Sequence, residues 1–118
     1  MAEFFIASPK HTLSRRRHRY ITFWRPDNQG YAWPLPWAGR YGEEAVRDPR
    51  QHYSDGEDTL AVPCEVVEAI AVAPKPGDID GDAGPVVLNT KENWAHLRSH
   101  ALIIQPVADL SAEFRRED

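Results

Sequence analysis

The chain has 118 residues, of which 42% are hydrophobic and 27% charged, a length and composition that predict one globular domain and exclude a disordered chain. The single cysteine excludes an intramolecular disulfide and is typical of a reducing, intracellular setting. The apolar runs are too short to span a bilayer and the N-terminus has no secretory signal, so we expect a cytoplasmic protein without a membrane partner.

The net charge of −4 is distributed unevenly along the chain. Residues 1–42 carry seven basic and two acidic side chains (net +5), whereas residues 43–82 carry three basic and eleven acidic ones (net −8). The two halves could pair with each other, and each surface pair would then stabilise the fold only slightly. Alternatively, one of the two charged faces binds a partner.

The first apolar run, residues 4–6 (FFI), predicts a strand that lies inside a sheet because it is apolar on both faces. The polar and basic segment 10–18 follows it and predicts an exposed loop. This loop contains three consecutive arginines, and such side chains are rarely buried.

Residues 19–41 hold seven of the twelve aromatic side chains and three of the four tryptophans. The β-favouring residues 20–24, the turn sequence PDNQG at 26–30 and the alternating segment 31–35 predict a β-hairpin over about 19–35. Pro34 has no N–H for a ladder, so the returning strand becomes an edge. Trp37 follows in a proline-rich corner, where its indole is a candidate for exposure.

The second half of the chain predicts short helices joined by loops. Three helices are indicated by three different signals. The first has acidic residues before a basic one, the second begins at a proline, and the third follows an Asn-x-x-Glu capping pattern from Asn89. We therefore expect one α+β domain over 1–110, with a small antiparallel sheet around the central hairpin. It is packed by helices at about 42–48, 63–71 and 90–100, with short strands at 59–62 and 102–104 and a charged, frayed tail at 111–118.

One candidate surface is basic and aromatic. Arginine beside aromatic rings can bind phosphates while nucleic-acid bases stack on the rings, as in single-strand binders. Alternatively, the guanidinium can form bidentate hydrogen bonds with the carboxylates of a protein. Nucleic-acid binding and protein binding both remain possible interpretations. The third is that the segment is only a solvated loop over an aromatic core. The candidate residues are Arg15, Arg16, Arg17, Arg19, Arg25 and Trp37.

A second candidate surface is acidic. Alternating aspartates from Asp78 onward invite a calcium loop, but Ala83 and Asn89 occupy the positions where an EF-hand needs glycine and glutamate. A carboxylate array can instead imitate nucleic-acid phosphates and occupy a basic groove of a nucleic-acid-handling protein; the alternative is an ordinary solvated face. The candidate residues are Asp55, Glu57, Asp58, Asp78, Asp80 and Asp82.

No motif with assigned catalytic or metal chemistry is present in the sequence. His96 and His100 share a helix face, but no third zinc ligand is near them in sequence. Cys64 follows Pro63 at a predicted helix start, and no spacing links it to a base. We predict no catalytic residue, no metal and no cofactor.

Three stretches together resemble small uncharacterised proteins of bacteriophages and prophages. They are RYITFWRPDNQGYAWPLPWAGRY (19–41), AVPCEVVEAI (61–70) and GPVVLNTKENWAHL (84–97). The resemblance implies a class rather than functional residues: small acidic phage products are often stoichiometric inhibitors of host defence, anti-CRISPR proteins among them.

We therefore predict a non-enzymatic binding protein of the phage-inhibitor type, which blocks a CRISPR-Cas-like nucleoprotein complex sterically or by charge mimicry. One alternative is a single-stranded nucleic-acid-binding module that uses the segment 15–25. The other is a small enzyme of a type that the sequence does not reveal.

Overall fold

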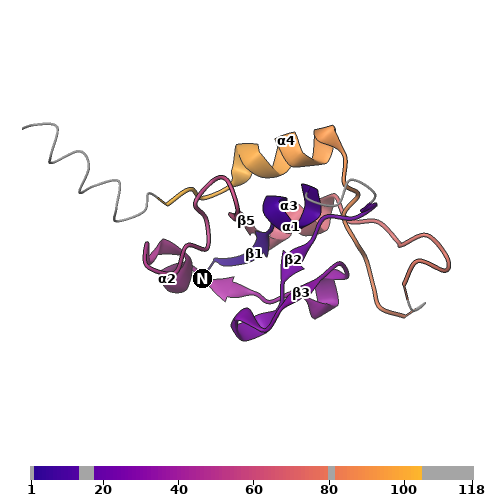
Figure 1. Ribbon diagram of the computed structural model, residues 1–118, viewed down its shortest axis with the longest axis horizontal. Helices are drawn as coiled ribbons and strands as arrows, with labels where there is room; N and C mark the ends of the chain where they lie inside the picture. The colour runs from indigo at the N-terminus through magenta and orange to yellow at the C-terminus, as the bar shows by residue number, and fades with distance from the viewer. Residues whose placement is uncertain (1, 14–17, 80–81, 105–118) are drawn as a thin grey trace, which may run out of the picture.

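The computed structural model describes residues 2–13, 18–79 and 82–104, which form a small five-stranded antiparallel sheet with short helices (Figure 1). Strand β1 (Glu3–Ala7) is central. Strand β5 (Leu60–Pro63) pairs along one edge of it, while β4 (Tyr41–Gly42) and β2 (Phe23–Trp24) pair in succession along the other. Strand β3 (Tyr31–Ala32) extends the sheet beyond β2. The predicted α+β class is confirmed.

The position of β1 follows from its side chains, which are apolar on both faces of the sheet. Phe5 and Ala7 enter the larger hydrophobic cluster, whereas Phe4 and Ile6 enter a second one on the opposite face. All four residues are at most 5% exposed. The prediction that residues 4–6 form an inner strand is therefore confirmed, but the sheet is built around this strand and not around the hairpin.

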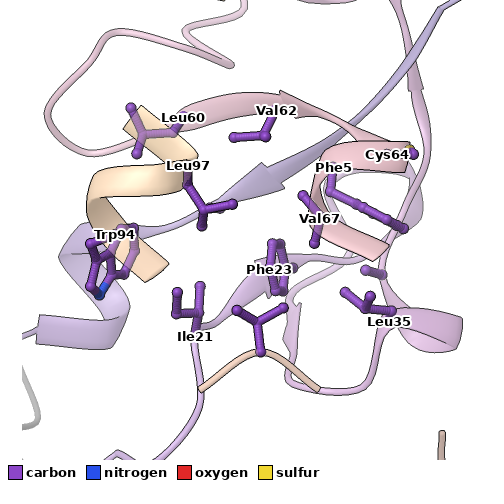
Figure 2. Close-up of a cluster of buried hydrophobic side chains, with 13 residues drawn as sticks. Phe5, Ile21, Phe23, Leu35, Leu60, Val62, Cys64, Val67, Trp94 and Leu97 are labelled. Atoms are coloured by element: carbon purple, nitrogen blue, oxygen red, sulfur yellow. The ribbon is translucent and has the colours of Figure 1, made fainter. Parts of the chain in front are cut away.

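Helices cover both faces of the sheet. Helices α3 (Cys64–Ala69) and α4 (Lys91–His100) supply Val67, Trp94 and Leu97 to the larger cluster, and Figure 2 shows these side chains directed towards the sheet. Helix α2 (Glu43–Arg47) supplies Val46 to the second cluster. The three predicted helices are present, each slightly shorter than expected.

The starts of α3 and α4 differ by one residue from their predictions. Pro63 is the N-cap of α3 and not its first helical residue. Thr90, not Asn89, caps α4, and its side chain accepts a hydrogen bond from the Asn93 N–H at 3.1 Å. Asn89 instead accepts the indole N–H of Trp94 at 2.6 Å, which holds this ring at the edge of the core.

The prediction of an exposed loop over 10–18 is wrong in its first half. Helix α1 (Pro9–Leu13) occupies it, and residues 14–17 lie outside the described residues. Ser8 Oγ accepts the N–H of His11 at 3.3 Å, and Pro9 stands at the first helical position, a pairing that favours a helix start. The Thr12 hydroxyl, fully buried, accepts the Thr22 N–H at 2.9 Å and ties α1 to the chain before β2.

The hairpin is much shorter than the predicted 19–35, because only β2 and β3 pair across it. Pro34 and Pro36 cannot donate to a ladder, so the returning strand stops at Ala32. The preceding segment 19–21 pairs instead with the chain before α4: the Ile21 N–H donates to Val87 O and the Asn89 N–H donates to Arg19 O, both at 2.8 Å. A segment distant in sequence has therefore replaced the second strand of the predicted hairpin as the partner of this segment.

The end of the described chain also differs from its prediction. The strand expected at 102–104 is reduced to an isolated bridge between Leu102 and Ala61. The long connection after α3 is a loop, as predicted; it is closed at its base by a bridge between Val72 and Val86 and projects at the end of the molecule away from α2 (Figure 1). The tail predicted at 111–118 lies outside the described residues. No helix in the described ranges is long and apolar enough to cross a membrane.

Candidate binding groove

A groove of about 470 Å³ opens beside β3, where segments far apart in the sequence meet. We call it the aromatic groove, because its walls carry three large aromatic rings and two imidazoles but few charged groups. It is lined by His11, His18, Thr22, Arg25, Tyr31, Ala32, Trp33, Pro34, Trp37, Asp78 and Ile79.

One wall of the aromatic groove is a stacked pair of rings. The His11 imidazole of α1 lies on the Tyr31 phenol of β3, with ring centroids 4.0 Å apart and planes 30° from parallel. Ser8 Oγ lies 2.8 Å from His11 Nδ1 and fixes the orientation of the imidazole. The pair therefore presents a rigid edge, although both residues are exposed.

The floor is formed by Trp33, which is held edge-on between two other rings. Its centroid lies 5.3 Å from that of His18 and 5.6 Å from that of Tyr20, both in T-shaped geometry. Such edge-to-face pairs stabilise a fixed ring orientation. Trp33 is half-buried and so keeps part of its surface available to a ligand.

Asp78 reaches the groove because Tyr20 anchors the loop that carries it. The buried Tyr20 hydroxyl donates to Asp78 Oδ2 at 2.6 Å and accepts the Lys75 N–H at 2.9 Å. The hydrogen bond to Asp78 raises the pKa of Tyr20, so the phenol remains a donor at neutral pH. Arg19 lies 3.7 Å from the same carboxylate and is itself exposed.

Two buried polar atoms of the groove lining have no hydrogen-bond partner among the described residues: Thr22 Oγ1 and His18 Nδ1. Thr22 is only 5% exposed, and its backbone N–H is already satisfied by Thr12. An unsatisfied buried hydroxyl costs about 1–3 kcal/mol, so this wall gains from a ligand that supplies the missing hydrogen bond.

The rim of the groove carries the large apolar surface. Tyr31 is 45% exposed and Trp37 is 41% exposed, and both face the same opening. The predicted exposure of the Trp37 indole is confirmed. The short helix that holds it (Leu35–Trp37) buries Leu35 in the core, which leaves Trp37 on the outer side.

A second depression, the acidic hollow, continues from the aromatic groove and shares His11 and Tyr31 with it. Asp55 Oδ1 there accepts the N–H groups of residues 57, 58 and 59 at 2.8 to 3.1 Å. Burial opposes ionisation of Asp55, but these donors outweigh it and hold its pKa below the ordinary value. Asp55 is therefore a turn-forming residue. The hollow is lined by Ser8, Lys10, His11, Trp24, Tyr31, His52, Asp55, Asp58 and Thr59.

The structure brings only part of each predicted surface together. From the basic and aromatic set, Arg25 and Trp37 line the groove and Arg19 lies next to it. Arg15, Arg16, Arg17 and Asp80 lie outside the described residues.

The acidic candidates are divided between two places. Asp78 lines the aromatic groove, whereas Asp55 and Asp58 line the acidic hollow. Glu57, Asp58 and Asp82 are exposed. Internal hydrogen bonds fix the orientation of the Asp55 and Asp78 carboxylates, and Asp78 also has Arg19 at 3.7 Å.

His11, His18 and Thr22 line the groove although the sequence pattern did not predict them as site residues. The Ser-Pro start of α1 was a local signal for the helix that carries His11. No local signal placed His18 or Thr22, because contacts distant in sequence position both: the chain before α4 pairs with residues 19–21, and Thr22 O accepts the Ser8 N–H at 2.8 Å.

Cys64 sits apart from the groove, at the start of α3 beside Arg40 and Glu68. Burial raises the pKa of this thiol to about 11, although the Arg40 charge opposes the shift. At pH 8 about one molecule in a thousand then carries the reactive thiolate. We expect the native protein to react with a disulfide reagent at least about a hundredfold more slowly than the chain unfolded in urea. Rapid stoichiometric modification of the native protein would contradict this.

Two further groups of side chains resemble catalytic or metal-binding arrangements, but each has a structural role or lacks the required partners. Ser8 and His11 resemble half of a catalytic triad, yet Ser8 is 1% exposed and caps α1. The rings of His96 and His100 lie 4.6 Å apart on α4. Within the described ranges, no three His, Cys, Asp or Glu side chains cluster in a way that could hold a metal ion.

Comparison of the chain with protein-family models, with curated protein sequences and with solved structures finds no match. The groove geometry and the chemistry of its residues therefore carry the functional argument.

Proposed function

We propose that the protein is a non-enzymatic binding protein that engages a protein partner through the aromatic groove. The observation that carries this is the exposure of Tyr31 and Trp37 at one opening, with Arg25 between the same walls. Tryptophan, tyrosine and arginine are the residues most enriched among the energetic centres of protein interfaces.

The rigidity of the groove supports the same function. The rings of Tyr31 and Trp33 are already held by His11, His18 and Tyr20, so little side-chain entropy is lost when a partner binds. Asp58 and Glu57 lie exposed near the acidic hollow and would add charge complementarity at the rim, which favours a basic partner surface.

The resemblance to phage proteins suggests the biological setting. In that setting the partner is a nucleic-acid-handling complex of the host, such as a CRISPR-Cas assembly, and binding inhibits it by occupying a working surface. The charge-mimic version of this idea places the main contact on the acidic residues instead of the groove.

A second candidate function is single-stranded nucleic-acid binding. It is favoured by one observation, that Arg25 and three aromatic rings line the same groove, as needed for phosphate contact and base stacking. A gel shift with single strands at two salt concentrations tests it; a shift at low salt that weakens at high salt supports this function.

The protein-partner function is tested by capture of a purified candidate complex on the immobilised full-length chain. We expect Trp37→Ala to weaken binding by about tenfold or more, because a fully desolvated interface tryptophan contributes ~2 kcal/mol or more. Leu88→Ala is the matched control, since Leu88 is equally exposed at 41% and lies outside the groove lining.

A double variant separates the two surfaces. If Glu57→Lys with Asp58→Lys abolishes binding while Trp37→Ala leaves it unchanged, the acidic face is the working surface and the groove is not. If all these variants bind the partner as the unmodified protein does, neither the groove nor the acidic face is the binding surface.

A further inference from the structure

We propose that the segment of the partner that enters the aromatic groove is proline-rich, in polyproline II conformation, and carries a basic side chain next to its prolines. This inference rests on the proposed function and names the chemistry that the same groove would recognise.

The shape of the lining fits such a segment. Polyproline II helices dock in grooves whose ridges are aromatic rings, because the proline rings fit between them. Here the stacked pair of His11 and Tyr31, the edge-held Trp33 and the exposed Trp37 provide successive ridges around one opening. Pro34, which is buried, belongs to the same lining.

The hydrogen-bonding groups of the groove also fit a proline-rich segment. A proline-rich segment has few N–H donors, and its backbone carbonyls need donors from the protein. The Arg25 guanidinium provides donors at the rim. The Thr22 hydroxyl of the lining also has no partner among the described residues, but it is buried, so Arg25 is the accessible donor.

The charges indicate which side chain accompanies the prolines. The aromatic groove runs into the acidic hollow at His11 and Tyr31, and the hollow carries the exposed carboxylate of Asp58 beside that of Asp55. The acidic hollow holds Asp55 and Asp58 against Lys10, whereas the Asp78 carboxylate of the groove already has Arg19 at 3.7 Å. The carboxylates of the hollow favour an arginine or lysine of the ligand at that end and disfavour a phosphate there.

Fluorescence anisotropy with labelled peptides tests the proposal on the full-length protein. The probe is a blocked Pro-x-x-Pro peptide followed by two arginines, compared with versions in which glycine replaces proline or alanine replaces arginine. We expect saturable binding of the first peptide with a Kd of about 10 μM to 1 mM, and at least about tenfold weaker binding of the glycine version.

Two variants locate the contacts. Trp37→Ala should weaken binding of the arginine-containing peptide by about tenfold or more. Asp58→Lys should weaken the arginine peptide but leave the alanine version unchanged, which assigns the basic side chain to the acidic hollow. Circular dichroism confirms that both exposed substitutions leave the fold intact.

Several outcomes overturn the proposal. Equal binding of the proline and glycine peptides refutes polyproline recognition, and stronger binding of a labelled oligothymidylate assigns the groove to nucleic acid. Absence of binding by all the peptides also refutes it. If a partner complex is nevertheless bound in a Trp37-dependent way, the proposed function stands and only the identity of the occupying segment is wrong.

Discussion

Replacement of Phe5 by alanine is expected to lower the free energy of unfolding by about 3–5 kcal/mol. Phe5 is 1% exposed, and its ring packs against Phe23 with centroids 5.9 Å apart while the Arg40 guanidinium lies 5.1 Å above it. It belongs to the central strand, where neighbouring strands on both edges limit the collapse of the cavity. Domains of this size are stable by only ~5–15 kcal/mol, so a large share of the stability would be lost.

The measurement is urea unfolding followed by circular dichroism. Trp37→Ala is the control, because it removes a larger side chain from a position that is 41% exposed and should change stability by less than about 0.5 kcal/mol. Similar losses in the two variants would mean that β1 is not the centre of the core. The same pair of variants separates stability from binding, since Trp37 is assigned to the groove.

Replacement of Tyr41 by phenylalanine is expected to lower the free energy of unfolding by about 1–3 kcal/mol, although it removes a single oxygen atom. The Tyr41 hydroxyl donates to the Arg25 carbonyl and accepts the Asn28 N–H at 3.2 Å. Asp27 and Asn28 have φ values of 55° and 59°, a left-handed conformation that aspartate and asparagine tolerate better than other residues with a Cβ. The Tyr41 hydroxyl thus joins both ends of this turn.

Burial raises the pKa of the Tyr41 phenol, so its hydroxyl stays protonated and able to donate throughout the neutral range. Tyr31→Phe is the matched control: Tyr31 is 45% exposed and its hydroxyl makes no hydrogen bond to any described residue, so we expect a change below about 0.5 kcal/mol. Equal stability of the two variants in urea unfolding would show that the turn does not depend on Tyr41.

Local sequence patterns determined much of the secondary structure. Residues 4–6 form an inner strand because they are apolar on both faces, and the three predicted helices are present because capping and apolar spacing are local signals. The exposed Trp37 indole also followed from its neighbours, since the prolines around it prevent a longer strand. The pattern of strand, turn and helix signals was enough for the α+β class, although it did not identify which strand lies at the centre.

Only the tertiary structure decided which residues meet at the groove. The predicted hairpin is shortened because the prolines of its second strand cannot donate, and the chain before α4 offered the missing backbone partners to residues 19–21. That long-range pairing positions His18, the hydrogen bond from the Ser8 N–H to Thr22 O positions Thr22, and the Tyr20 hydroxyl, 58 residues away in sequence, brings Asp78. Backbone hydrogen bonds must be satisfied wherever a donor is available in the folded chain, so these contacts depend on the whole sheet and not on any local pattern.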